Sequence, residues 1–259
     1  MEVTYFHFHD VKKKDVNLVI DIGNTCVKLL CFDKGEVVEE QRSDKDDICA
    51  LDSFVRKYPF SKGIYSTVSD LSSLYLEHLN SLPFPMIEFK SGETPIPIIN
   101  KYKTPFTLGS DRLAAAIGAN ALMPDKDLLI IDIGTCITFD FVSAKGEYLG
   151  GNISPGPSMR LKALNHFTAR LPLVERNGET PNLGFDTETA IRSGVQKGIK
   201  YEIEGYINSF LAKYPQLYVY LTGGVHLNLQ FSEKFCIFAD DFIVPKGLNR
   251  ILEYNNEFK

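Results

Sequence analysis

One short acidic turn occurs twice in this chain. The stretch IDIGNTCVK covers residues 20–28, and IDIGTCITFD covers residues 131–140. Each copy is an apolar run that ends in Asp-Ile-Gly, followed by small polar residues and a second apolar run, which predicts two strands joined by a tight turn. Two unrelated strand ends that both need Asp and Gly are the alternative. The shared Asp-Ile-Gly and the Thr-Cys that follows in both copies favour two similar halves.

Composition limits the class of protein. The chain has 259 residues, 44% hydrophobic and 24% charged, which fits a globular protein of about two domains. No apolar run is long enough to cross a bilayer, and the amino terminus lacks the pattern of a signal peptide. The net charge of −5, with one basic triplet at residues 12–14, argues against a nucleic-acid-binding protein. The five cysteines are dispersed without a CxxC pair, which predicts reduced thiols and a cytoplasmic location.

Both halves are expected to have the same order of elements. The first half predicts strands 18–22, 27–32 and 36–40, helix 46–57, strand 63–68, helix 71–79, strand 86–89, a loop at 91–105 and helix 110–123. The second half predicts strands 128–133, 136–142 and 147–153, helices 158–168 and 187–214, strand 219–221, and a final strand and helix. We therefore predict an amino-terminal extension at 1–16, a first domain at 17–124 and a second at 125–259.

The predicted long helix carries a regular apolar stripe. Its aliphatic residues recur every four positions and should face a core: Ile191, Val195, Ile199, Ile203, Ile207 and Leu211.

The two turns suit a metal-bound nucleotide. Glycine after a strand lets backbone N–H groups approach an anion, and the side chains of Asn24, Thr25 and Thr135 can donate to phosphate oxygens. The carboxylates of Asp21 and Asp132 would repel phosphate unless a cation lies between them. Two such turns facing each other across a cleft would hold the phosphates between the domains. No GxxxxGK[ST] or GxGxxG pattern occurs, which excludes those two nucleotide-binding motifs.

Further motifs occur in a fixed order. GSDR at residues 109–112 immediately precedes the apolar helix LAAAIGANAL, and GGNISPG follows the third strand of the second half. A strand ending in Thr-Gly-Gly lies at 221–224, and T-x-x-A-I-x-S-G covers 187–194. The paired turns with Thr-Gly-Gly resemble the phosphate and adenosine motifs of the actin, sugar-kinase and Hsp70 superfamily. With GSDR added, the chain resembles type III pantothenate kinase from about residue 16 to the last helix.

The resemblance implies an α/β fold of two similar RNase H-like domains with a nucleotide cleft between them. It implies phosphorylation of pantothenate by ATP, the first step toward coenzyme A, in a cytoplasmic homodimer that binds neither nucleic acid nor membrane. The implied cofactors are Mg²⁺ with ATP and a monovalent cation, K⁺ or NH₄⁺, held by Asp132. Cys136 stands where family members commonly have alanine.

The resemblance also implies the roles of single residues. Asp111 would be the catalytic base, and Thr135 would contact ATP. The remaining ATP contacts would be Asp21, Ile22, Gly23, Asn24, Thr25, Cys26, Val27, Lys28, Gly223 and Gly224. The pantothenate contacts would be Tyr102, Gly109, Ser110, Asp111, Arg112 and Thr187.

Local physics agrees with a base at Asp111. Ser110 is expected to cap the helix, which would place Asp111 in the first turn, where the helix dipole favours an ionised carboxylate. Arg112 offers a planar set of donors for the carboxylate or amide oxygens of pantothenate. Without the motif, Asp111 would be read as a simple cap and Arg112 as a surface charge.

Two other functions stay open at this point. One is a kinase of the same superfamily that acts on another small hydroxyl substrate. The other is a non-catalytic family member, such as a transcriptional accessory factor. The retained Asp111 and the acidic net charge favour the enzyme.

Overall fold

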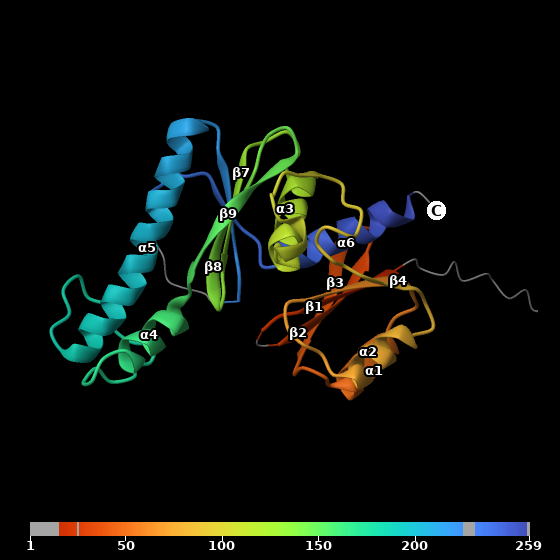
Figure 1. The fold of residues 1–259 in the computed structure, drawn as a ribbon, viewed down its shortest axis with the longest axis horizontal. Coiled ribbons are helices and arrows are strands. Elements are labelled where there is room, and N and C mark those ends of the chain that lie inside the picture. The colour runs from red at the N-terminus through yellow and green to blue at the C-terminus, as the bar shows by residue number, and fades with distance from the viewer. Residues whose placement is uncertain (1–15, 25, 225–230, 258–259) are drawn as a thin grey trace, which may run out of the picture.

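The computed structural model describes residues 16–24, 26–224 and 231–257, and it contains two β-sheets (Figure 1). The five-stranded sheet has the order β3-β2-β1-β4-β5. Its strands are β1 (Val16–Ile22), β2 (Val27–Asp33), β3 (Glu36–Ser43), β4 (Phe60–Thr67) and β5 (Met86–Glu88). The hairpin β1–β2–β3 is antiparallel, and β4 and β5 run parallel to β1.

The six-stranded sheet repeats this plan with the order β11-β10-β7-β8-β9-β6. Its strands are β6 (Ile99–Asn100), β7 (Leu128–Ile133), β8 (Cys136–Val142), β9 (Glu147–Pro155), β10 (Tyr218–Thr222) and β11 (Ile237–Ala239). Here β7–β8–β9 is the antiparallel hairpin, while β10 and β11 run parallel to β7. The duplicated sequence therefore forms the same hairpin in both sheets, as predicted.

Side-chain alternation along each first strand separates the core into layers. Leu18, Ile20 and Ile22 of β1 pack under helices α1 (Ile48–Val55) and α2 (Ser73–Asn80), whereas Val19 faces the opposite side. In β7 the odd-numbered residues pack under α4 (Pro157–His166) and α5 (Thr187–Lys213), and Leu128 and Ile130 face the opposite side. Both inner faces meet α3 (Ser110–Leu122) and α6 (Ile243–Asn256), which lie between the sheets (Figure 1).

Helices α3 and α6 join the two halves through small residues. A side-chain carbon added to Gly118 would overlap the carbonyl oxygen of Ile243, and one added to Gly247 would overlap that of Ala114. Glycine is therefore required for the two helix backbones to touch. A buried hydrogen bond of 2.7 Å from Asn17 on β1 to Asn249 on α6 adds a polar contact to this joint. The two sheets are thus fixed to a common pair of helices.

Most elements agree with the prediction, and the later starts of two helices have local causes. Helix α1 begins at Ile48, because Asp46 has a φ of 60° and the side chain of Asp47 caps the amide of Ala50 at 2.9 Å. Helix α2 begins at Ser73, because Ser72 caps Tyr75. The apolar stripe of α5 is confirmed: its residues from Ile191 to Ile207 are buried and Leu211 is partly buried.

Three features differ from the prediction. The expected loop at 91–105 contains β6, and the short 3₁₀ helix Pro105–Thr107 comes after β6 in the chain. Strand β6 pairs with β9 of the second sheet, although it belongs to the predicted first domain. Ser110 is not the cap of α3: Gly109 is the N-cap, and the Ser110 hydroxyl donates to the carbonyl oxygen of Phe89 at 3.4 Å. No helix of the described chain is long and apolar enough to cross a membrane.

Candidate functional site

The first turn places a carboxylate and an ammonium side by side. Asp21 and Lys28 are register partners on β1 and β2, and their charged atoms Oδ2 and Nζ lie 3.8 Å apart. The Gly23 amide donates to the carbonyl oxygen of Cys26 at 3.1 Å and closes the turn. Ile22 and Val27 point into the core of the first half, so only their backbone groups face the turn. Asn24 is exposed, and Thr25 lies outside the described residues.

The second turn has the same closure with one residue fewer. The Gly134 amide donates to the carbonyl oxygen of Cys136 at 2.8 Å, and Thr135 is exposed at the tip. The Gly156 amide, at the end of β9, donates to the carbonyl oxygen of Thr135 at 3.0 Å. The turn is thereby tied to the GGNISPG stretch.

The Thr-Gly-Gly stretch lies directly beside the second turn. Thr222 at the end of β10 is the register partner of Asp132 on β7. Gly223 has a φ of 113°, and a side-chain carbon there would come within 2.6 Å of the Asp132 Oδ1 atom. Gly224 is exposed. Gly223 must therefore be glycine both for its backbone angle and for its close approach to Asp132.

The amino terminus of α3 adds the third carboxylate. The Asp111 Oδ1 atom accepts a hydrogen bond of 2.8 Å from the Arg112 backbone amide, and Gly109 precedes it as the N-cap. Burial raises the pKa of the Asp111 carboxyl, and the hydrogen bond from Arg112 partly offsets this effect. Burial of Asp111 therefore disfavours its ionised form, whereas its place in the first turn of α3 favours that form.

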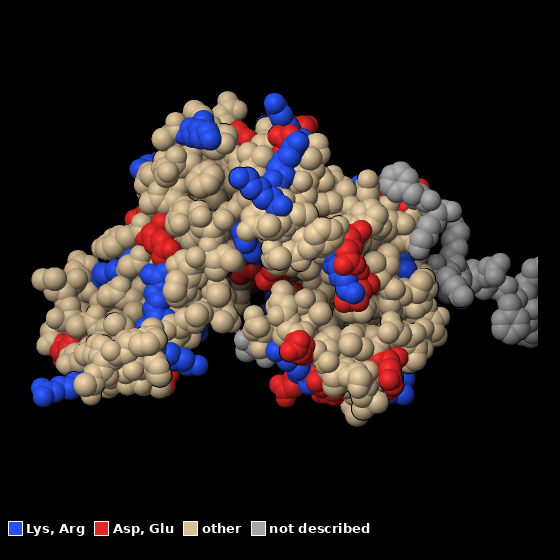
Figure 2. Space-filling view, in the orientation of Figure 1, with Lys and Arg blue, Asp and Glu red and all other residues tan. Residues whose placement is uncertain are grey.

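These segments meet at one place. Burial raises the pKa of Asp21 to about 6, with the charge of Asp111 adding to the rise and Lys28 opposing it. Burial raises the pKa of Asp132 to about 7, and the charges of Asp111 and Asp21 add to that rise. Figure 2 shows the molecule hollowed between its two lobes, with acidic and basic side chains at the inner end of the hollow. Asp21, Asp111, Asp132 and Lys28 therefore belong to one electrostatic cluster.

Asp132 has the properties of a cation ligand. Its carboxylate receives no hydrogen bond or ion pair from the described residues, although the residue is half-buried. Within the described part of the chain, no group of three or more His, Cys, Asp or Glu side chains is arranged to hold a metal ion. A cation at Asp132 would therefore need backbone carbonyls, water or phosphate oxygens to complete its coordination. This donor set fits a cation that binds together with a phosphorylated ligand.

Arg112 is buried in a polar cluster that includes a residue missed in the sequence. Its Nη2 atom donates to Asp140 Oδ1 at 2.6 Å, and its Nε donates to the same atom at 3.0 Å. The Tyr148 hydroxyl donates to Asp140 at 2.6 Å, and the Tyr102 ring centre lies 6.0 Å from the guanidinium carbon. One signal for Asp140 was available in the sequence, because it is the only charged residue within the apolar strand 136–142.

Thr187 lies apart from this cluster. It begins α5, which covers the face of the second sheet opposite α3, and it is exposed. Figure 1 shows that end of α5 beside α4, at the far side of the molecule from α1 and α2. Asp186 caps the helix in a reciprocal capping box with Thr189. Of the predicted pantothenate contacts, those at 102–112 come together and Thr187 does not join them within one chain.

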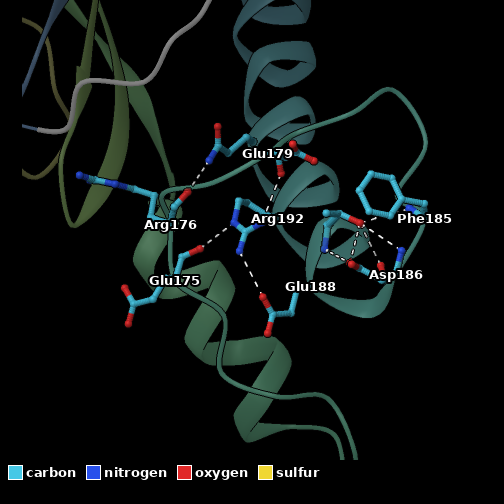
Figure 3. A network of polar contacts seen from close by, with 9 residues as sticks. Glu175, Arg176, Glu179, Phe185, Asp186, Glu188 and Arg192 are labelled. Atoms are coloured by element: carbon cyan, nitrogen blue, oxygen red, sulfur yellow. Dashed lines mark hydrogen bonds and ion pairs between the residues drawn. The ribbon is translucent and has the colours of Figure 1, made fainter.

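The segment 167–186 that precedes Thr187 has no helix or strand and is held by α5 (Figure 3). The buried Arg192 side chain donates from Nε to the carbonyl oxygen of Glu175 at 2.9 Å and from Nη1 to that of Glu179 at 3.3 Å. Gln196 donates to the carbonyl oxygen of Arg176 at 2.7 Å. Two side chains one turn apart on α5 therefore fix a long loop.

Comparison with known proteins adds the family. Residues 17–209 match the family model for type III pantothenate kinase. A type III pantothenate kinase from Bacteroides fragilis is 53% identical over 241 residues, which is 93% of this chain and 99% of the relative. The chain belongs to the type III pantothenate kinase family. It is therefore a kinase, and the similarity covers both duplicated turns. A relative of the same name from Cytophaga hutchinsonii is 39% identical over 93% of this chain and all of its own length.

Solved structures agree with the fold of this kinase family. The crystal structure of a conserved putative Baf family transcriptional activator from Campylobacter jejuni is similar with a TM-score of 0.60, at 24% identity over 93% of this chain and 99% of its own. A putative N-acetylmannosamine kinase from Listeria monocytogenes is similar with a TM-score of 0.53 at 12% identity, over 94% of this chain and all of its own. At these identities the likeness concerns the fold alone. The predicted α/β fold of two similar lobes is confirmed.

Proposed function

We propose that this kinase transfers the γ-phosphoryl group of ATP to the 4′-hydroxyl of pantothenate, in the cytoplasm, as the first step of coenzyme A synthesis. Family membership supports the substrate class. The observation that carries the chemistry is the cluster of Asp21, Asp111 and Asp132, in which burial raises the pKa of each carboxyl and the charge of Asp111 further raises the pKa of Asp21 and Asp132. Three carboxylates forced together are unfavourable unless cations and a phosphorylated ligand complete the site.

The two turns and the Thr-Gly-Gly stretch are proposed to hold ATP. Backbone amides and the exposed side chains of Asn24 and Thr135 would donate to the phosphates, and Lys28 would add a positive charge. Gly223 and Gly224 would lie along the adenosine. Mg²⁺ bound to ATP would neutralise the phosphate charge that faces Asp21. K⁺ or NH₄⁺ bound at Asp132 would neutralise the phosphate charge that faces the second turn. In this account the protein contributes mainly position and charge.

Asp111 is proposed as the base. Its carboxylate would accept the proton of the pantothenate hydroxyl as the oxygen attacks the γ-phosphorus, and ADP would leave on the opposite side. Because burial raises the pKa of Asp111, its ionised form is lost when the pH falls through that raised value. Nearby cations stabilise the ionised form, so a bound cation extends the active range toward lower pH.

A homodimer would account for the separate position of Thr187. Within one chain the second sheet stands between Thr187 and Asp111, because α5 and α3 cover opposite faces. Around the start of α5 large apolar side chains are exposed: Phe167 is 81% exposed, Phe185 71% and Leu183 86%. A groove of about 730 Å³ between α4 and α5 lies beside Phe167. We propose that this apolar surface packs against a second copy, which places Thr187 at the partner's acceptor site.

The proposal is tested by ADP release with an acceptor screen. Purified protein with MgATP and K⁺ should release ADP when pantothenate is added and at a much lower rate without it. Sugars and small hydroxy acids serve as competing acceptors. Faster ADP release with one of these acceptors would show that the protein is a kinase for that acceptor and not for pantothenate. No release with any acceptor, from a folded protein that binds ATP, would favour the non-catalytic accessory factor.

A further inference from the structure

The carboxylate of Asp140 organises the buried surroundings of Arg112. Asp140 is 1% exposed and Arg112 is 7% exposed. Both Nε and Nη2 of the guanidinium donate to this carboxylate, and the Tyr148 hydroxyl donates to it from the side. These three residues come from α3, β8 and β9, so the cluster ties the amino end of α3 to the second sheet. A fork-shaped pair of hydrogen bonds fixes the direction of the guanidinium as well as its position.

The GGNISPG stretch on β9 is shaped around this cluster. A side-chain carbon added to Gly151 would overlap the carbonyl oxygen of Phe139 and would lie 2.8 Å from the Arg112 Nη2 atom. Gly150 has a φ of 121°, and a carbon added there would lie 3.6 Å from the Tyr102 ring. Gly156 follows directly after this strand, and its amide donates to the carbonyl oxygen of Thr135 in the second turn. One strand therefore contacts both the Arg112 cluster and the second phosphate turn.

We propose that Asp140 is a positioning residue for the acceptor, holding the Arg112 guanidinium at a fixed distance and angle from Asp111 and from the second turn. This proposal rests on the function proposed above, and it adds a residue that would act through Arg112 without contact to acceptor or nucleotide. Arg112 follows Asp111 in the first turn of α3, so a shift of one moves the other. The Tyr102 ring, which lies over the guanidinium and packs against Tyr148, would move with them. Small displacements of this kind act strongly on transfer between two bound reactants.

The central test is Asp140→Asn, which keeps the size of the side chain and removes its charge. Catalytic efficiency toward pantothenate is expected to fall by roughly 10- to 100-fold, mainly through a higher KM for pantothenate. The KM for ATP should stay within about two-fold. The matched control is Glu39→Gln, because Glu39 also accepts from a cation and a tyrosine hydroxyl, Lys57 at 2.6 Å and Tyr58 at 2.6 Å, at the edge of the other sheet. This control should leave both KM values unchanged.

A double-mutant cycle separates positioning from a general loss of structure. If Asp140 acts through Arg112, then Asp140→Asn should have little further effect in an Arg112→Gln background. Full additivity of the two losses would overturn the proposal, and so would equal rises in the KM values for ATP and pantothenate. If Asp140→Asn does not fold, Tyr148→Phe removes one donor to Asp140 and keeps the ring. Its pantothenate KM should rise about three-fold or more with the ATP KM unchanged, and an unaltered pantothenate KM would overturn the proposal.

The outcome is distinguishable from failure of the proposed function. A wild-type protein without pantothenate-dependent ADP release would remove the function. A wild-type protein that phosphorylates pantothenate, with an Asp140→Asn variant equally efficient, would leave the function and remove the role of Asp140.

Discussion

At the scale of single residues, Asp132 is expected to reduce the stability of the ligand-free protein. Burial raises the pKa of its carboxyl to about 7 in the folded chain, from the 3.8 that is usual for an aspartate in the unfolded chain. Between these values the folded state keeps a proton that the unfolded state has released, so the free energy of unfolding falls as the pH rises from about 4 to about 7. Above about pH 7 this carboxyl lowers the free energy of unfolding no further.

The variant Asp132→Asn removes this titration. At pH 8 without K⁺, we expect its free energy of unfolding to exceed that of the wild type by about 2–4 kcal/mol, a Tm higher by roughly 5 °C or more. At pH 4 the two proteins should be nearly equal. Thermal melts at both pH values check this. A lower or unchanged Tm for the variant at pH 8 would mean that Asp132 is already compensated inside the folded chain.

The two aspartates of the duplicated turns should differ in the ion on which they depend. Asp21 is paired with Lys28 on the turn proposed to face MgATP, so Asp21→Ala should mainly shift the Mg²⁺ and ATP dependence of the rate. Asp132 has no such partner among the described residues, so Asp132→Ala should mainly shift the K⁺ dependence. Superimposable Mg²⁺ and K⁺ titrations of the two variants would remove the separate roles.

The sequence predicted what short-range patterns determine and missed what distant contacts determine. Apolar runs joined by short Gly-containing turns predicted the β1–β2 and β7–β8 hairpins, because central strands that are buried on both faces are apolar along most of their length. Strand β6 was missed, because two residues carry no pattern and are fixed only by pairing with β9. Ser110 was wrongly predicted to cap α3, because its hydroxyl is used by Phe89, twenty-one positions earlier. Asp140 acquires its role only from Arg112 and Tyr148 in the folded chain.

At the scale of elements, Arg192 is expected to control the segment 167–186. Arg192→Met keeps the apolar stem and removes the donors to Glu175 and Glu179 (Figure 3). Losing the hydrogen bonds that the buried Arg192 guanidinium donates costs about 1–3 kcal/mol, which should increase local opening of the segment roughly 10-fold or more. Trypsin should then cut after Arg176 at a correspondingly higher rate, as measured by mass spectrometry of the fragments.

The control for Arg192→Met is Lys197→Met. Lys197 also reaches the segment from α5, but its bond of 2.7 Å to Asn182 is exposed and contributes little. Cleavage after Arg176 should be as slow as in the wild type. Equal cleavage rates for all three proteins would mean that Arg192 does not hold the segment.

At the scale of the whole molecule, the apolar surface around Phe167 should decide the oligomeric state. The wild type is expected to show twice the chain mass of 29.1 kDa in light scattering. Phe167→Asp places a charge on the surface proposed to meet the second copy and should yield a monomer. The control Phe106→Asp changes a comparably exposed phenylalanine, 72% against 81%, in the 3₁₀ helix between β6 and α3, and should stay dimeric. A dimeric Phe167→Asp variant would assign the contact to another surface.

The contact between α3 and α6 links the two lobes of the molecule. The helix of Asp111 touches the carboxyl-terminal helix backbone to backbone at Gly118 and Gly247, so the proposed base lies on a helix pair that packs on both sheets. The duplicated turns come from separate sheets, and each sheet packs on this helix pair. Closing of the lobes around ATP would then bring the two turns toward Asp111 and exclude water, the competing phosphoryl acceptor.

The most direct test of this account is pantothenate-dependent ADP release by Asp111→Asn under conditions in which the chemical step limits the rate. The asparagine keeps an oxygen for the Arg112 amide at 2.8 Å and the size of the carboxylate, so the fold and ATP binding should be preserved. It cannot accept the hydroxyl proton, so turnover should fall by roughly 10² or more. The control Asp70→Asn, at an exposed loop position, should match the wild type. Turnover by Asp111→Asn close to that of the wild type would contradict the assignment of Asp111 as the base.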